Sequence, residues 1–259
     1  MAEELQIRVH GDASSPTLVY LPGLHGDWTL IGSFREALQE RVRFVEFVYP
    51  RTLTWSLEEY AEAIENVLAA NQITHGWLLG ESFGSQIVWP LLHRCRFRVE
   101  GIVLAGGFAR HPIGWGVRLA EKIAGSIPLT LIAQILFGYA RLARARFRRS
   151  PETLAGINEF IARRTELDRR AAVHRLHLIS ENDPCSIAQN ARVPIFGLTG
   201  VFDPIVQWWW VRPWLRKNCA SLRDYQIFWG ADHNVLGTAP KRAAEQVVAW
   251  IAQHLPDVQ

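Results

Sequence analysis

Short apolar stretches alternate along the chain with longer segments of helical periodicity. The stretch Thr17–Leu21 is continuously apolar, as expected for a strand that is covered on both faces. Leu5–Val9 instead alternates with period two, which indicates a half-exposed strand. The predicted strands lie at residues 5–9, 17–21, 43–48, 76–79, 101–105, 193–200 and 225–229. Because helical segments separate most of these strands, the pattern predicts an α/β fold with a parallel sheet and helices on both faces.

Capping signals mark two of the predicted helices. Ser56 and Glu59 have the spacing of a capping box, and apolar residues behind them trace one helical face. The last helix is announced by Thr238 and Pro240, because proline is favoured in the first turn of a helix. A further helix is predicted at about residues 29–40, and another directly after residue 84.

The alternation of strands and helices stops near residue 108 and resumes near residue 192. Residues 109–191 show helical periodicity but no strand pattern. We therefore predict a core formed by residues 1–108 and 192–259, with residues 109–191 inserted as a helical cap. An apolar face at residues 127–137 could line an acyl pocket, although packing against the core is the favoured interpretation.

Composition and charge exclude several classes of protein. The net charge of +3 is too small to indicate a nucleic-acid partner. Three widely spaced cysteines fit neither a zinc site nor a disulfide framework, and they favour a reducing compartment. The acidic start of the chain is unlike a signal peptide, and no apolar run reaches the length of a membrane span. These features predict a cytoplasmic protein without a transmembrane segment.

Arginine is concentrated in one part of the predicted cap. Residues 141–175 contain ten arginines and four acidic residues. The cluster of Arg141, Arg144, Arg146, Arg148 and Arg149 leaves open an anionic substrate or an acidic acyl carrier as partner. A solvated helix face is the favoured interpretation of this cluster.

Tryptophan is concentrated after the sixth predicted strand, at Trp208, Trp209, Trp210 and Trp214. Three consecutive residues cannot all face inward on a helix, so at least one of Trp208–Trp210 should be partly exposed. The cluster could wall a pocket mouth, form a homo-oligomer contact or touch a membrane surface. Burial against the cap is the favoured interpretation.

A nucleophile motif follows the fourth predicted strand. The sequence Gly80-Glu81-Ser82-Phe83-Gly84 has the G-x-S-x-G pattern between a strand and a helix. A serine on such a sharp turn has a strained backbone, and neighbouring backbone is packed close to it. The two glycines are expected because a side chain at either position would have no room. Ser82 is therefore the predicted nucleophile.

Candidate partners for Ser82 follow the last two strands. Asp203 lies just beyond the sixth strand and His233 just beyond the seventh, which gives the chain order nucleophile, acid, base. A histidine takes the serine proton, and a carboxylate holds that histidine in the correct tautomer. Asp232 competes for the acid role, but a residue adjacent to His233 usually points elsewhere. Asp203 is therefore the predicted acid and His233 the predicted base.

Stabilisation of an oxyanion needs two backbone N–H groups that point at one oxygen. Phe83, directly after the nucleophile, is expected to supply one. The loop after the second strand is expected to supply the other, and Gly23 lets its backbone approach closely. Leu24 is the predicted second donor, with His25 as the alternative.

These motifs resemble the α/β-hydrolase fold superfamily over nearly the whole core. The matching segments are Leu21–Leu24, Gly80–Gly84, Gly200–Val206 and Gly230–His233. The resemblance implies a mostly parallel eight-stranded sheet with an inserted helical cap, and it implies the same roles for Ser82, Asp203 and His233. Three departures are Pro22 where the family often has histidine, Ser85 where it often has glycine, and Pro90 in the helix after the serine turn.

The predicted activity is that of a serine hydrolase that cleaves small-molecule carboxylic esters through an acyl-enzyme, without metal or organic cofactor. An acyl thioesterase remains the alternative enzyme, since the fold does not fix the substrate. A binding protein that kept the fold and lost the chemistry is the alternative from another class.

Overall fold

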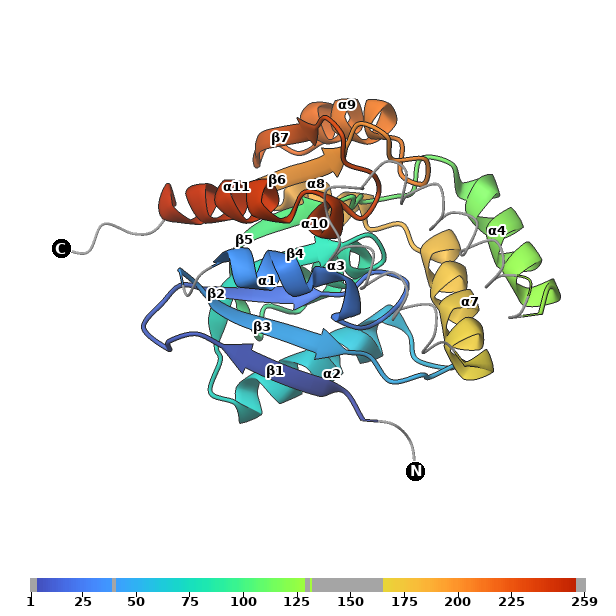
Figure 1. Ribbon diagram of the computed structural model, residues 1–259, viewed down its shortest axis with the longest axis horizontal. Coiled ribbons are helices and arrows are strands. Elements are labelled where there is room, and N and C mark those ends of the chain that lie inside the picture. Colours follow the sequence, from blue (N-terminus) through green and yellow to red (C-terminus); the bar gives the residue numbers. More distant parts are fainter. Residues whose placement is uncertain (1–3, 39–40, 129–130, 132–164, 255–259) are drawn as a thin grey trace.

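The computed structural model describes residues 4–38, 41–128, 131 and 165–254 (Figure 1). Seven strands form one sheet in the order β1-β3-β2-β4-β5-β6-β7. They are β1 (Gln6–His10), β2 (Thr17–Leu21), β3 (Arg43–Val48), β4 (His75–Glu81), β5 (Arg98–Ala105), β6 (Ile195–Gly200) and β7 (Leu222–Phe228). Every neighbouring pair is parallel except β1 and β3, which are antiparallel.

All seven segments predicted as strands form strands, with ends that differ by a few residues. Every residue of β2 and β6 is buried, which explains their continuous apolar sequences. The edge strand β1 is mostly exposed, in agreement with its alternating pattern. The count of eight strands is wrong for the described residues, which contain seven. That count came from the resemblance, whereas the hydrophobic pattern itself predicts seven.

Helices cover both faces of the sheet (Figure 1). The described helices are η1 (Thr29–Ile31), α1 (Gly32–Leu38), α2 (Leu57–Ala70), α3 (Gly84–Arg94), α4 (Gly114–Ser126), α7 (Glu166–Glu181), α8 (Cys185–Asn190), α9 (Trp208–Asn218), α10 (Val235–Thr238) and α11 (Pro240–Ala252). Side chains of α1, α10 and α11 share one apolar core with one face of the sheet. Side chains of α2, α3, α8 and α9 share the other core.

The predicted capping signals are present in the structure. Ser56 accepts a hydrogen bond from the Glu59 N–H, and the Glu59 carboxylate accepts one from the Ser56 N–H. This reciprocal pair satisfies two N–H groups that the first turn of α2 leaves without helical partners. Pro240 is the first residue of α11. The local sequence thus fixes where both helices begin.

Helices α4 and α7 lie beyond the carboxyl ends of the parallel strands and pack against each other (Figure 1). A second capping box, formed by Thr165 and Asp168, begins α7. Asp168 also accepts a 2.6 Å hydrogen bond from Arg51, which ties this end of α7 to the core. At the other end, Asn182 donates to Gln86 of α3 over 2.9 Å. Helix α7 is therefore anchored to the core at both ends.

Parts of the predicted cap lie outside the described residues. These parts include the arginine cluster at 141–149 and most of the apolar face at 127–137. Within 109–191, the described residues form α4, α7 and α8. The boundaries of the cap at residues 109 and 191 remain a prediction.

Candidate active site

The turn between β4 and α3 carries Ser82 in a strained conformation. Ser82 has a φ angle of +48°, in the left-handed region that residues with a side chain rarely adopt. A Cβ atom on Gly84 would lie 2.0 Å from the carbonyl oxygen of Leu21, and one on Gly80 would lie 2.8 Å from the Cα of Ser85. Neither position has room for a side chain, so the structure confirms the predicted reason for both glycines.

Ser85, which stands where the family often has glycine, is completely buried and stabilises this turn. Its hydroxyl donates a 2.6 Å hydrogen bond to the carbonyl oxygen of Ser82. The Oγ of Ser85 in turn accepts a 3.1 Å hydrogen bond from the N–H of Phe108, just beyond β5. Ser82 itself donates its N–H to the carbonyl oxygen of Ala105 at the end of β5. The departure at Ser85 therefore links the serine turn to the neighbouring strand.

The structure brings Ser82, His233 and Asp203 together in one hydrogen-bonded chain. The Nε2 atom of His233 lies 2.9 Å from the Oγ of Ser82, and its Nδ1 lies 2.8 Å from the Oδ2 of Asp203. A carboxylate only accepts hydrogen bonds, so Nδ1 is the donor to Asp203. In the neutral ring, Nε2 is then the acceptor for the hydroxyl of Ser82. This tautomer is the one that a general base requires.

The two candidate acids differ in what they contact. The Asp203 side chain is fully buried, and its Oδ1 accepts the N–H groups of Ile205 and Val206 at 2.9 and 2.8 Å. Those two bonds leave Oδ2 directed at His233. Asp232 instead accepts the N–H of Asn234 at 3.1 Å, within its own loop. Of the two carboxylates, Asp203 is the one that is hydrogen-bonded to His233.

The surroundings of His233 favour its protonated form. Burial on its own lowers the pKa of His233, but the hydrogen bond and negative charge of Asp203 outweigh that effect. Glu81 and Asp232 add further negative charge, and the pKa of His233 is raised above its ordinary value of 6.5. An imidazolium formed during a reaction would therefore be stabilised at this position.

The loop after β2 lies against the start of α3, as the oxyanion hypothesis requires. A Cβ atom on Gly84 would lie within 3.0 Å of the carbonyl oxygens of both Leu21 and Pro22. The Phe83 ring is buried edge-on against Tyr49 and Tyr60, which fixes the backbone after Ser82. Among the described residues, neither the Leu24 nor the Phe83 N–H has a hydrogen-bond acceptor. Both groups therefore remain candidates for binding an oxyanion.

Arg175 of α7 holds this loop in place, and the sequence analysis did not identify it. Its guanidinium, buried with the rest of the side chain, donates to the carbonyl oxygens of Leu24 and Pro50 at 2.9 and 3.2 Å. Gly26 makes room for it, because a Cβ atom there would lie 2.5 Å from the Arg175 Nη1. Arg175 lies on the buried face of α7 with Ala171 and Ile179, four residues away on either side. An arginine on an apolar helical face was the signal that could have revealed it.

Glu81 is a second residue that the sequence analysis did not assign to the site. Its carboxylate is buried beside Ser82 and accepts a hydrogen bond from the hydroxyl of Tyr20. The Nε2 of His25 lies 3.9 Å from the same carboxylate oxygen. Burial and the neighbouring Glu81 raise the pKa of Tyr20 well above its ordinary range, so its hydroxyl remains a donor. A glutamate at the end of an apolar strand was the available signal.

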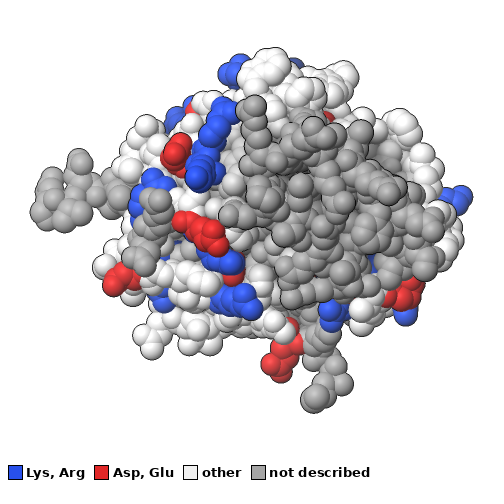
Figure 2. All heavy atoms as spheres, in the orientation of Figure 1, with Lys and Arg blue, Asp and Glu red and all other residues white. Residues whose placement is uncertain are grey.

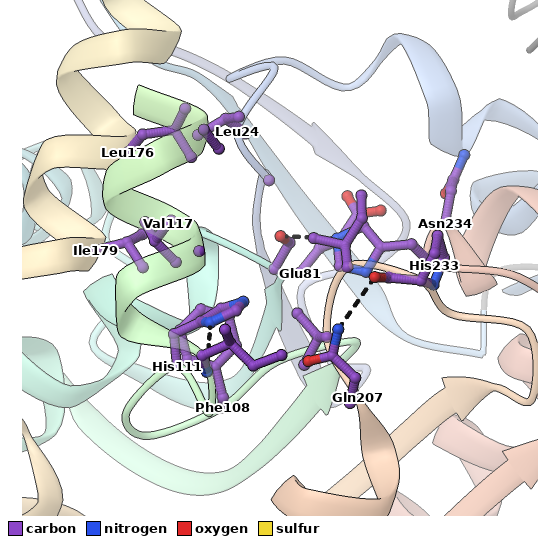
Figure 3. Close-up of a pocket in the computed structure, with 18 of the residues that line it drawn as sticks. Leu24, Glu81, Phe108, His111, Val117, Leu176, Ile179, Gln207, His233 and Asn234 are labelled. Carbon is purple, nitrogen blue, oxygen red and sulfur yellow. Dashed lines mark hydrogen bonds between the residues drawn. The ribbon is translucent and has the colours of Figure 1, made fainter. Parts of the chain in front are cut away.

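A cavity of about 540 Å³ opens at Ser82 and His233 (Figure 3). Its wall on the side of α4 and α7 is apolar and includes Val117, Leu176 and Ile179. Asn234 and Gln207 lie on the other side, near His233. Apolar walls with few polar groups are typical of sites for small molecules. Helices α4 and α7 therefore form the apolar wall of the cavity, and the core supplies its polar groups.

His111 lies just before α4 and lines the cavity. Its Nδ1 accepts a 3.1 Å hydrogen bond from the N–H of Ile113, and its ring packs edge-on against Phe108. Burial lowers the pKa of His111, so the ring is neutral at neutral pH. With Nδ1 as the acceptor, the proton is on Nε2. His111 is thus a neutral wall residue beside the hydrogen-bonded chain.

Two kinds of feature are absent from the part of the chain that the structure describes. No group of three or more His, Cys, Asp or Glu side chains there is arranged to hold a metal ion. None of the helices in that part combines the length and apolar character needed to cross a bilayer.

The fold and this site define an α/β-hydrolase architecture with a serine at the nucleophile turn. The model of the alpha/beta hydrolase family matches residues 9–246, and the chain belongs to this family. Membership of this family supports hydrolase activity. No curated protein matches the sequence.

Similar solved structures cover almost the whole chain at low sequence identity. An enol-lactonase from Burkholderia xenovorans LB400 has a TM-score of 0.78 at 20% identity, over 96% of each chain. A thermophilic esterase from Thermogutta terrifontis has a TM-score of 0.75 at 19% identity, over 96% of this chain and 94% of that one. A hydrolase from Pseudomonas aeruginosa PA01 has a TM-score of 0.78 at 16% identity, over 95% and 94%. At these identities the likeness shows the fold alone.

Proposed function

We propose that the protein is a serine hydrolase that cleaves carboxylic esters through an acyl-enzyme intermediate. The observation that carries the proposal is the hydrogen-bonded chain from the Ser82 Oγ through His233 to Asp203, with links of 2.9 and 2.8 Å. A serine, a histidine and a buried carboxylate in this order are the groups that acyl transfer requires. The esterase and the enol-lactonase among the similar structures support the same class of reaction.

In the proposed reaction, the Ser82 Oγ attacks the acyl carbon while the Nε2 of His233 removes its proton. Asp203 holds the ring and stabilises the imidazolium that forms. The N–H groups of Leu24 and Phe83 bind the developing oxyanion, and His233 then protonates the departing alcohol. A water molecule activated by His233 attacks the acyl-enzyme, which releases the acid and restores Ser82.

The cavity supports an apolar acyl group as the bound part of the substrate. Its volume of about 540 Å³ lies within the range of small-molecule sites. Transfer of an apolar chain from water onto the side chains of α4 and α7 would contribute about 0.8 kcal/mol for each buried CH₂ group. Turnover of p-nitrophenyl esters should therefore improve as the acyl chain lengthens, until the cavity is filled.

The test compares Ser82→Ala with Ser126→Ala, which changes an exposed serine at the end of α4. Ser82→Ala should keep the fold, abolish hydrolysis of p-nitrophenyl butyrate and abolish labelling by a fluorophosphonate probe. Ser126→Ala should match the wild type in both assays. Retained turnover in Ser82→Ala would overturn the assignment, and failure of the wild-type protein to react with the probe would favour a binding protein.

A further inference from the structure

Large apolar side chains are exposed on α9 and on the loops that follow β6 and β7. Trp209 and Trp210 of α9 are 49% and 62% exposed, so the expected exposure within Trp208–Trp210 is confirmed. Burial of these two residues against the cap, the interpretation favoured from the sequence, is wrong. Other exposed residues nearby are Phe202, Ile205 and Trp229, at 55%, 54% and 77%. We call these five residues the aromatic rim.

The aromatic rim is continuous with the catalytic loops. Ile205 lines the cavity that holds Ser82, and it lies two residues from Asp203. Phe202 and Trp229 line a neighbouring hollow together with Arg242 of α11. The N–H of Phe202 donates to Ala231, two residues before His233. The loops that carry the acid and the base therefore also carry exposed apolar residues.

The start of α9 is fixed firmly to the core. Trp208 is partly buried, and its indole N–H donates a 3.3 Å hydrogen bond to the carbonyl oxygen of Val201. Its ring packs edge-on against Trp209 at a centroid distance of 5.6 Å. Val211 and Leu215 of the same helix are buried in the core beneath it. The exposed tryptophans are thus held outward by a packed helix.

Positive charge accompanies the aromatic rim. Residues 204–223 contain four basic residues, Arg212, Arg216, Lys217 and Arg223, and no acidic residue. Arg216 and Lys217 are exposed in the last turn of α9, about two turns beyond Trp209 and Trp210. Figure 2 shows the edge of the molecule over α9 as uncharged, with basic side chains beside it. An exposed aromatic surface with basic side chains beside it is complementary to an anionic, partly apolar surface.

We propose that the aromatic rim and the basic end of α9 form a docking surface for phospholipid bilayers that contain anionic headgroups. Tryptophan is favoured at the level of the headgroups, where its ring is apolar and its N–H is polar. Each basic residue near an anionic bilayer adds an attraction of comparable size to a hydrogen bond. A second copy of the chain is the less suitable occupant, because a symmetric contact would bring like charges together. Because Ile205 belongs both to this surface and to the cavity wall, docking in this way would bring the cavity close to a source of apolar substrates.

Vesicle binding tests this surface independently of catalysis. The full chain carrying Ser82→Ala is mixed with vesicles of phosphatidylcholine alone, or of phosphatidylcholine and phosphatidylglycerol in equal parts, and sedimented. We expect binding to the anionic vesicles, and weaker binding at high salt. Because the Ser82→Ala variant lacks the proposed nucleophile, the result does not depend on whether the wild type is an esterase. Absence of binding to the anionic vesicles would overturn the proposal.

Substitutions locate the binding within the surface. Trp209→Ser combined with Trp210→Ser should weaken binding by about tenfold or more, because the apolar area that enters the bilayer is lost. Ile123→Ser is the matched control, since Ile123 of α4 is 49% exposed, like Trp209, and lies outside the rim. Arg216→Gln and Lys217→Gln should each weaken binding by about fivefold. Arg98→Gln, at an exposed arginine that begins β5, should leave binding unchanged.

Two outcomes would contradict the proposed occupant. Equal vesicle binding by the protein with both tryptophans and by the variant with Trp209→Ser and Trp210→Ser would show that another face meets the lipid. Light scattering could instead detect a dimer of the protein with both tryptophans and a monomer of this variant. If neither then bound vesicles, the surface would be assigned to a second copy of the chain. Circular dichroism and thermal unfolding are measured on each variant to establish that α9 remains folded.

Discussion

The guanidinium of Arg175 donates a 2.9 Å hydrogen bond to the carbonyl oxygen of Leu24. This bond joins α7 to the loop whose N–H is proposed to bind the oxyanion. The same guanidinium contacts Gly26, whose φ angle of +80° and missing side chain allow the close approach. Helix α7 therefore lines the cavity and also holds the loop that contains Leu24.

Arg175→Met should lower kcat by about 10- to 100-fold and change KM much less. The loop would lose the hydrogen bond from Arg175 to the Leu24 carbonyl oxygen and would be positioned less precisely. The expected loss is smaller than that for removal of a whole oxyanion donor, which costs about 10²- to 10³-fold in kcat. Arg175→Lys should restore part of kcat, because an ammonium can still donate to Leu24. Steady-state kinetics on a p-nitrophenyl ester measures the split, and Arg170→Met, at an exposed arginine of the same helix, is the control. Equal losses in kcat for both methionine variants would argue against a positioning role.

Asp203→Asn should reduce kcat by about 10⁴-fold, because an amide no longer holds His233 in the required tautomer. Asp232→Asn should have a far smaller effect, since Asp232 contacts Asn234 and not the ring of His233. Both variants are compared by kcat at the pH optimum, with thermal unfolding as the check on folding. A larger loss in Asp232→Asn than in Asp203→Asn would identify Asp232 as the acid.

The rate of ester hydrolysis should fall as the pH is lowered through the pKa of His233. The general base acts in its neutral form, and its pKa is raised, so the acid limb of kcat/KM should lie above pH 6.5. Glu81→Gln removes one of the negative charges that raise this pKa, so the limb should move to lower pH. Full pH profiles of the wild type and Glu81→Gln measure the shift. An unchanged limb in Glu81→Gln would show that Glu81 does not act on His233.

Gly84→Ala should destabilise the fold by about 3 kcal/mol and lower activity. The new Cβ would lie 2.0 Å from the Leu21 carbonyl oxygen, so the nucleophile turn and the oxyanion loop would have to separate. Gly114→Ala, at the first position of α4, is the matched control because no atom lies within 4 Å of its new Cβ. That substitution should be neutral or stabilise by up to about 1 kcal/mol. Urea unfolding of both variants measures the difference.

Local patterns were sufficient to predict most of the fold. The seven strands follow from apolar runs, and the capping box of Ser56 and Glu59 fixes the start of α2. The predicted site residues follow from their positions after strands, because carboxyl ends of parallel strands meet at one edge of the sheet. The chain order of Ser82, Asp203 and His233 predicted which residues would meet, and the structure joins His233 to both of the others.

Contacts between distant segments were beyond the reach of the same reasoning. Arg175 and Leu24 are 151 residues apart, and Glu81 and Tyr20 are 61 residues apart. Nothing in the local sequence of either partner specifies the other. The exposure of Trp209 and Trp210 depended in the same way on which face of α9 packs against the core.

The sequence by itself determined the order of the elements, the strained turn at Ser82 and the identity of its candidate partners. These properties depend on steric limits and hydrophobic periodicity, which act between residues close along the chain. Only the tertiary structure decided that Asp203 rather than Asp232 bonds to His233, that Arg175 holds the loop at Leu24, and which tryptophans face outward. Those features arise when the layers pack, because burial then requires each buried polar group to find a partner in another segment.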